Sequence, residues 1–139
     1  MRYAFALLLL GCGTLPSGAR PAPSYARAAL ATWTAAGYPA GRCAEQARIL
    51  HVLETSAAET RDLCHEEGVA GCLLVTDVGL LGLGGDQIVV VMDRQYAGPW
   101  LLAHEATHWL GRCSGLDVQH GDSRFFQAPG SVQARLAEL

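Results

Sequence analysis

Two histidines that stand four residues apart, His104 and His108, constrain this chain more than any other feature of its sequence. They lie in a Leu- and Ala-rich stretch between Gly98-Pro99 and Gly111, which predicts a helix with the proline in its first turn, where the missing N–H is not needed. At about 100° per residue, this spacing puts both imidazoles on one face, one turn apart. Two ring nitrogens placed in this way can reach a single Zn²⁺ ion at roughly 2.0 to 2.1 Å.

Glu105 follows the first histidine and completes the pattern His-Glu-x-x-His. It is near enough to act on a water molecule that the metal ion activates, without binding the ion itself. Because zinc lowers the pKa of such a water toward about 7, a carboxylate can take its proton and direct hydroxide at a carbonyl carbon. The competing interpretation of so short a motif is a pair of solvated histidines on a helix surface.

The motif resembles that of the zincin metallopeptidases, and the later segment His120-Gly121-Asp122-Ser123-Arg124-Phe125-Phe126 is similar to the His-Gly-x-x-aromatic segment of SprT-like and related short zincins. The resemblance covers roughly residues 45 to 126. It implies a zinc hydrolase in which His104, His108 and His120 hold the ion and Glu105 is the general base. It also implies a small α+β domain, with a short, mainly antiparallel sheet packed on helices that include the motif helix.

Three residues are candidates for the third metal ligand. The resemblance implies His120, whereas Asp117 or Asp122 would serve in an aspartate-liganded zincin, or would orient an imidazole. In the related segment an aromatic residue packs behind the histidine. Here Arg124 holds that position and Phe125 comes one residue late, so the packing role does not carry over directly.

The resemblance further implies how a substrate would lie. In zincins the edge strand of the sheet aligns an extended peptide, because an unpaired edge offers backbone N–H and C=O groups. The β-branched run from Gln87 to Met92 is the candidate for that strand. A donor to the oxyanion is expected as well, with Tyr96, Arg124 and His65 as alternatives.

The first residues are typical of a signal peptide, assigned to residues 1–11. Arg2 precedes an apolar run of eight residues, which is too short to cross a hydrocarbon layer of roughly 30 Å as a helix. Leu9-Leu10-Gly11-Cys12 resembles the lipobox of bacterial lipoproteins, which implies cleavage before Cys12 and a lipid on that cysteine. An ordinary secretory signal with a chance cysteine is the alternative.

Residues 12–23 are rich in Pro, Gly, Ser and Ala and are predicted to be a flexible, lipid-anchored tether, which leaves residues 24–139 as the zinc hydrolase domain. The resemblance to lipoproteins implies a location in the bacterial cell envelope. Gly13, rather than Asp, after the modified cysteine favours the outer membrane and its periplasmic face.

Four further cysteines support export: Cys43, Cys64, Cys72 and Cys113. An even number suits two disulfides in an oxidising compartment, and three pairings are possible. We favour Cys64 with Cys72, close together across a Gly-containing turn, and Cys43 with Cys113, which would tie an early segment to the end of the motif helix. A four-cysteine zinc site is the competing idea, but the chain has no C-x-x-C pair.

Length, composition and charge limit the number of domains and the kinds of partner. With 139 residues, half of them apolar, the chain has room for one core and a single domain. Its net charge is only −3 and its basic residues form no stripe, so we expect no nucleic acid partner.

We expect a monomer with zinc as cofactor, a peptide or protein as substrate, and contact with the membrane through the lipid on Cys12. Two other functions remain open: a non-catalytic envelope lipoprotein or binding module with a structural metal or disulfides, and a peptidoglycan endopeptidase or amidase.

The other elements are predicted from caps and apolar runs. Helices are expected at 25–36 between caps at Ser24 and Gly37, at 57–67 from the capping box Ser56-Ala-Ala-Glu59 to Gly68, at 122–128, and from Ser131 to Glu138. Strands are expected at 72–77 and 87–93, joined by a Gly-rich connection over 78–86, while 47–54 fits either a strand or a helix.

Overall fold

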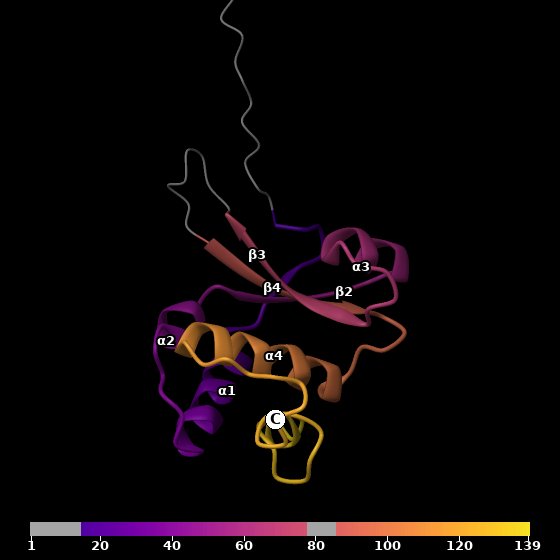
Figure 1. Ribbon diagram of the computed structural model, residues 1–139. Helices are drawn as coiled ribbons and strands as arrows, with labels where there is room; N and C mark the ends of the chain where they lie inside the picture. Colours follow the sequence, from indigo (N-terminus) through magenta and orange to yellow (C-terminus); the bar gives the residue numbers. More distant parts are fainter. Residues whose placement is uncertain (1–14, 78–85) are drawn as a thin grey trace, which may run out of the picture.

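A four-stranded sheet forms the centre of the domain in the computed structural model, which describes residues 15–77 and 86–139 (Figure 1). Its strands, in the order β1-β2-β4-β3, are Arg20–Pro21, Leu50–Thr55, Asp86–Asp93 and Gly71–Asp77. β1 and β3 pair antiparallel with their neighbours, whereas β2 and β4 run parallel, so the sheet is mixed. With its helices this makes a small α+β domain, as predicted.

The strand predicted as the free edge, β4, lies inside the sheet instead. It pairs with β2 from Ile88 to Asp93 and with β3 from Asp86 to Met92. Every residue from Ile88 to Met92 is buried, because layers of side chains cover both faces of this strand. The prediction that Gln87 to Met92 forms the substrate edge was therefore wrong: a continuous β-branched run marks a strand covered on both sides. In the described part of the sheet, the edge strands are β3 and the two-residue β1.

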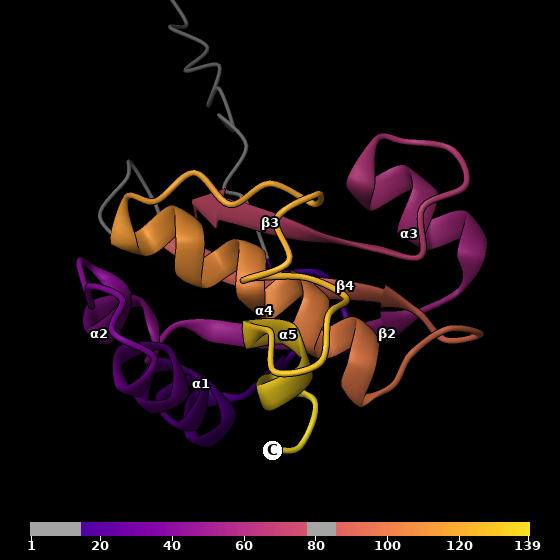
Figure 2. The same cartoon turned by 60° about the horizontal axis from the view of Figure 1, so that its bottom comes forward.

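Helices cover the two faces of the sheet unequally (Figures 1 and 2). α3 (Ala57–Cys64) packs on one face, over Leu53, Val89 and Val91. The other face carries α1 (Pro23–Ala35), α2 (Cys43–Gln46), α4 (Pro99–Ser114) and α5 (Val132–Leu136). The main core lies between this face and these helices, so α4 is anchored by a broad apolar layer.

Local signals set several helix boundaries as predicted. Ser56 and Glu59 form the expected capping box at the start of α3, and the Ser131 hydroxyl accepts a hydrogen bond from the backbone N–H of Ala134. Gly37, at a φ of +92°, follows the end of α1 in the left-handed region. Each of these signals acts within one turn of chain, so it can be recognised without knowing the fold.

Other boundaries differ from the prediction. α1 begins one residue before Ser24, because Pro23 occupies its first position and Ala22 its N-cap. α3 ends at Cys64, where His65 takes a φ of 56°, before the predicted stop at Gly68. Residues 122–128 form turns rather than a helix, α5 ends at Leu136, and the ambiguous segment 47–54 becomes β2.

α4 extends beyond its predicted end at Gly111, through to Ser114. Gly115, with a φ of +79°, provides the left-handed cap instead. Gly111 is required for another reason: a Cβ at this position would lie 2.6 Å from the Cγ2 atom of Val118. The chain that follows α4 therefore packs directly on the backbone of the helix.

The two disulfides join the cysteines that the sequence analysis favoured. Cys43 bonds to Cys113, across 70 residues, and ties α2 to the last turn of α4. Cys64 bonds to Cys72 and ties the end of α3 to β3. Since disulfides persist in oxidising surroundings, both indicate a compartment of the extracellular type.

From Leu15 onward the chain lies on the sheet, although residues 12–23 were predicted to be a flexible tether. β1 pairs with β2, the Ala22 N–H donates to the Leu50 carbonyl at 2.9 Å, and Leu15 packs beside Leu53. Residues 1–14, with Cys12, and residues 78–85 of the Gly-rich connection lie outside the described residues. In the part that is described, no helix has the length and apolar character needed to cross a membrane.

Candidate metal centre

Three imidazoles converge at one place on the surface of α4: His104 and His108 from the helix, and His120 from the segment that follows it. The Nε2 atom of His120 lies 2.8 Å from Nε2 of His108 and 3.2 Å from Nε2 of His104. One nitrogen of each ring lies within 4.8 Å of the other two. Nitrogens bound at 2.0 to 2.1 Å to a tetrahedral ion stand about 3.3 Å apart, so the cluster is close to the size that zinc requires.

Hydrogen bonding alone satisfies this cluster poorly. A neutral imidazole carries a single N–H, so a proton on Nε2 of His120 could at best be shared between the two neighbouring rings. A cation satisfies three nitrogen lone pairs at once. The donor set of three neutral nitrogens is also one that zinc accepts readily. The three residues present therefore fit a zinc ion.

Burial and mutual proximity lower the pKa values of His104 and His108 and so favour the neutral form of these two rings. Burial, followed by the neighbouring His104 and His120, lowers the pKa of His108 to about 4. Burial, and then His120, also lowers the pKa of His104, against a smaller opposing effect of a hydrogen bond with Gln133. Neutral imidazole is the form whose lone pair binds a metal ion.

The aromatic residue behind the three rings is Phe126. Its ring centroid lies 4.9, 4.8 and 5.2 Å from those of His104, His108 and His120, and the side chain is only 2 % exposed. Phe125 points elsewhere and packs on Trp33 at 5.8 Å between centroids. The resemblance to short zincins placed the aromatic residue at position 124, with Phe125 one residue late. It therefore did not identify Phe126 as the residue that packs behind the imidazoles.

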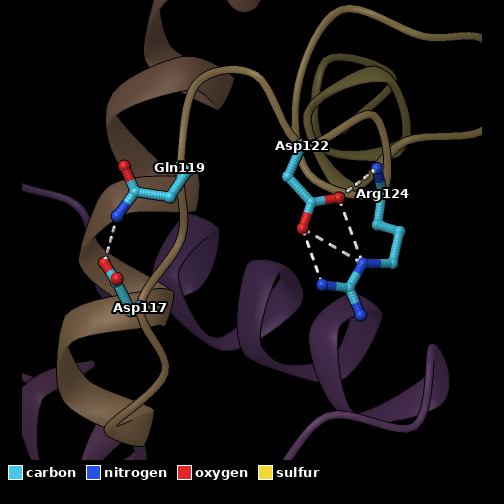
Figure 3. Close-up of polar contacts among 4 residues, drawn as sticks. All are labelled: Asp117, Gln119, Asp122 and Arg124. Carbon is cyan, nitrogen blue, oxygen red and sulfur yellow. Dashed lines mark hydrogen bonds and ion pairs between the residues drawn. The ribbon is translucent and has the colours of Figure 1, made fainter.

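The two aspartates considered as third ligands face other partners (Figure 3). Asp117 accepts a hydrogen bond from the Gln119 amide at 2.6 Å. Asp122 pairs with the Arg124 guanidinium at 2.6 Å, and these hydrogen bonds hold the pKa of its carboxyl below the usual range. Neither carboxylate belongs to the group of side chains that converge on the imidazoles. Of the three candidates, His120 is the one that the structure brings to the site.

Glu105 lies next to the cluster, on the side of α4 that faces the sheet. It is 6 % exposed, and burial raises the pKa of its carboxyl to about 7. Across from it, Gly71 of β3 leaves room: a Cβ at that position would lie 3.5 Å from Oε1 of Glu105 and 2.6 Å from the Val91 carbonyl oxygen. The glycine thus lets β3 approach β4 closely without covering the carboxylate.

A cavity of about 820 Å³ opens beside these groups, between β3 and the first turns of α4. This volume is typical of sites that bind small molecules or peptide side chains. Apart from the imidazoles and Glu105, its walls are mostly apolar, with Val69, Leu73, Pro99, Trp100 and Leu101 among them. Trp100 is 50 % exposed and forms part of the cavity wall.

Of the three candidates for an oxyanion donor, Tyr96 lines the cavity and is 58 % exposed. Arg124 is engaged by Asp122, and His65 ends α3; neither is among the described residues that line the cavity. His51 is buried in β2, with its Nδ1 3.0 Å from the Ile49 carbonyl oxygen. Gln133, which the sequence analysis did not single out, also lines the cavity.

No protein-family model matches the chain, and neither the curated proteins nor the solved structures yield a match. Function is therefore inferred from the chemistry of the site.

Proposed function

We propose that this protein is a zinc-dependent metallopeptidase that hydrolyses peptide bonds. The observation that supports the proposal most strongly is the convergence of three imidazole nitrogens beside a buried carboxylate, all in the wall of one cavity. His104, His108 and His120 would hold the ion. Three protein ligands leave one position open, which distinguishes catalytic zinc sites from structural ones.

Zinc bound here supplies a Lewis acid and lowers the pKa of water. Glu105 takes a proton from the attacking water at its carboxylate and delivers it to the amine that leaves. Because the side chain is buried beside His104, it is held in place and shielded from bulk solvent. The Tyr96 hydroxyl donates a hydrogen bond to the carbonyl oxygen of the peptide, where negative charge develops.

β3 is the strand that would align the substrate. Gly71, Cys72 and Leu73 line the cavity, and the side of β3 away from β4 carries backbone groups that an extended peptide can pair with. The apolar walls favour substrates with apolar side chains next to the bond that is cut. This assignment takes the place of the strand from Gln87 to Met92.

The protein would work in the bacterial cell envelope, as a monomer held to a membrane by the lipid on Cys12. The two disulfides, which suit an oxidising compartment, support this location. The lipobox-like residues before Cys12 and the short apolar run ahead of them support export and anchoring.

The decisive experiment compares the purified wild type with Glu105→Gln, measuring zinc content and peptide hydrolysis together. The variant should hold one zinc ion per chain and lose about 10²- to 10⁴-fold in turnover, because only the proton acceptor is removed. Glu45→Gln, an exposed change on α2, is the control and should alter neither property. Full activity in Glu105→Gln, or a wild type that binds no zinc, would refute the proposal.

The choice of substrate separates the rival functions in the same experiment. Unstructured proteins and muropeptides are offered in parallel to the zinc-loaded protein. A peptidoglycan endopeptidase or amidase would cut the muropeptides alone. A non-catalytic binding module would leave both intact while retaining zinc.

A further inference from the structure

A second cavity, of about 390 Å³, lies beyond His108 toward the C-terminal end of α4. Its walls include Leu73 of β3, His108 and Arg112 of α4, and the segment from Leu116 to Val118. Leu73 and His108 line the main cavity as well, so the two cavities meet at the candidate metal centre. A substrate that spans the metal centre would therefore reach into both.

Arg112 lies on the same face of α4 as the two histidines of that helix. His104, His108 and Arg112 follow one another at intervals of four residues, each about one turn further along. β3 runs beside α4, with its arrowhead toward the C-terminal end of the helix (Figure 2). Arg112 thus stands about 6 Å beyond His108 along the helix, a distance that an extended peptide covers in about two residues.

The guanidinium of Arg112 is available to a ligand. The residue is exposed, and the ion pairs among the described residues involve Arg42, Arg61 and Arg124 instead. Its positive charge suits the last turn of a helix, where the backbone carbonyls carry partial negative charge. This effect of charge does not occupy the N–H donors of the guanidinium, which present a planar fork to solvent.

The two cavities differ in the charge of their walls. Apart from the imidazoles, the charged side chains among the described residues of the main cavity are Glu66 and Glu105, both acidic. The second cavity holds Arg112 together with Asp117, whose carboxylate accepts a hydrogen bond from the Gln119 amide at 2.6 Å. A carboxylate brought to the metal centre is therefore better placed beside Arg112, whose fork can bind it with two parallel hydrogen bonds.

We propose that Arg112 is a specificity-determining residue that binds a carboxylate of the peptide substrate, about two residues from the bond that is cut. The carboxylate comes from an acidic side chain or from the end of the substrate chain. The inference rests on the proposed function, in that it assumes that peptides are cut at the three imidazoles.

Peptide binding to the metal-free protein tests the inference without turnover. Three sets of N-acetylated peptides are compared by fluorescence anisotropy: one with a free C-terminal carboxylate, one amidated with a single Glu moved along it, and one amidated and uncharged. The wild type should bind one of the carboxylate-bearing sets about 5- to 20-fold more tightly than the uncharged set. The set that gains identifies the source of the carboxylate, and equal affinities for all three would overturn the inference.

Variants assign the preference to Arg112. Arg112→Gln should abolish it, whereas Arg112→Lys should retain part of it, because lysine keeps the charge but not the paired donors. Arg48→Gln is the matched control, since Arg48 is also exposed and is not among the residues that line either cavity. A preference that survives in Arg112→Gln, or that Arg48→Gln loses equally, would overturn the inference.

Kinetics of the zinc-loaded protein separate this inference from the proposed function. Arg112→Gln should raise KM for the preferred peptides about 5- to 20-fold with little change in kcat, because the contact lies away from the reacting atoms. A wild type that binds these peptides with the expected preference but cuts none would refute the proposed function and leave the carboxylate site standing. A wild type that cuts all three sets equally well would refute the carboxylate site alone.

Discussion

Gly111 and Val118 are in such close contact that a single methyl group on the glycine would lie 2.6 Å from Cγ2 and 2.7 Å from Cγ1 of the valine. Val118 precedes His120 by two residues, so this contact sets where the third imidazole enters the cluster. A β-branched side chain has little freedom to turn away, and any relief must come from the backbone.

Gly111→Ala should therefore destabilise the protein, although the same change inside an exposed helix stabilises by about 1 kcal/mol. We expect a loss of about 1 to 3 kcal/mol in the free energy of unfolding, measured with urea, and weaker zinc binding. Adding Val118→Ala should recover much of both. A more stable Gly111→Ala protein would contradict the close contact.

The adjacent residues Phe125 and Phe126 form a natural pair of variants. Changing either to Leu should cost on the order of 1 kcal/mol of stability, because both are buried. Only Phe126→Leu should also lower zinc affinity, since its ring packs on all three imidazoles. Chelator competition on the two purified proteins checks this, and equal affinities would show that the packing does not support the site.

Tyr96→Phe removes the hydroxyl proposed to stabilise the oxyanion. We expect kcat to fall by about 10²- to 10³-fold with little change in KM, because the interaction forms as charge develops on the carbonyl oxygen. Steady-state kinetics with a peptide substrate provide the measurement. Tyr38→Phe is the control, as this ring packs on Trp33 at 4.6 Å in the core around α1 and should leave kcat unchanged.

The two disulfides should contribute different amounts to the free energy of unfolding. Closing a loop of 70 residues restricts the unfolded chain more than closing one of 8, by about 4 against about 2.5 kcal/mol on the chain-entropy estimate. Cys43→Ala with Cys113→Ala should thus lower the urea midpoint more than Cys64→Ala with Cys72→Ala. The reverse order would indicate that the unfolded chain is not the main source of the stabilisation.

Features set by short stretches of chain could be predicted from the sequence. The spacing of His104 and His108 fixes their common face on any helix, and the capping box at Ser56 acts within one turn. The disulfide pairing was favoured among three possibilities, because Cys64 and Cys72 lie close together in the sequence, and the structure contains it. His120 came from a resemblance, and the structure places it with the other two imidazoles.

Features that depend on contacts between distant segments could not be predicted. The run from Gln87 to Met92 shows that a strand is apolar, but its neighbours depend on pairings with β2 and β3 that leave no local mark. Phe126 rather than Phe125 faces the imidazoles because of the turns over 122–128, whose geometry the sequence pattern did not reveal. Gln133 lines the cavity from a separate helix, and this position arises only when α5 packs on α4.

The bond between Cys43 and Cys113 also makes the stability of the domain depend on its redox surroundings. Cys113 lies in the last turn of α4, the helix that carries His104 and His108. A chain still in a reducing compartment lacks this covalent closure and unfolds more readily. The helix that carries two candidate metal ligands is therefore most stable in oxidising surroundings, and a reductant weakens it without touching the imidazoles themselves.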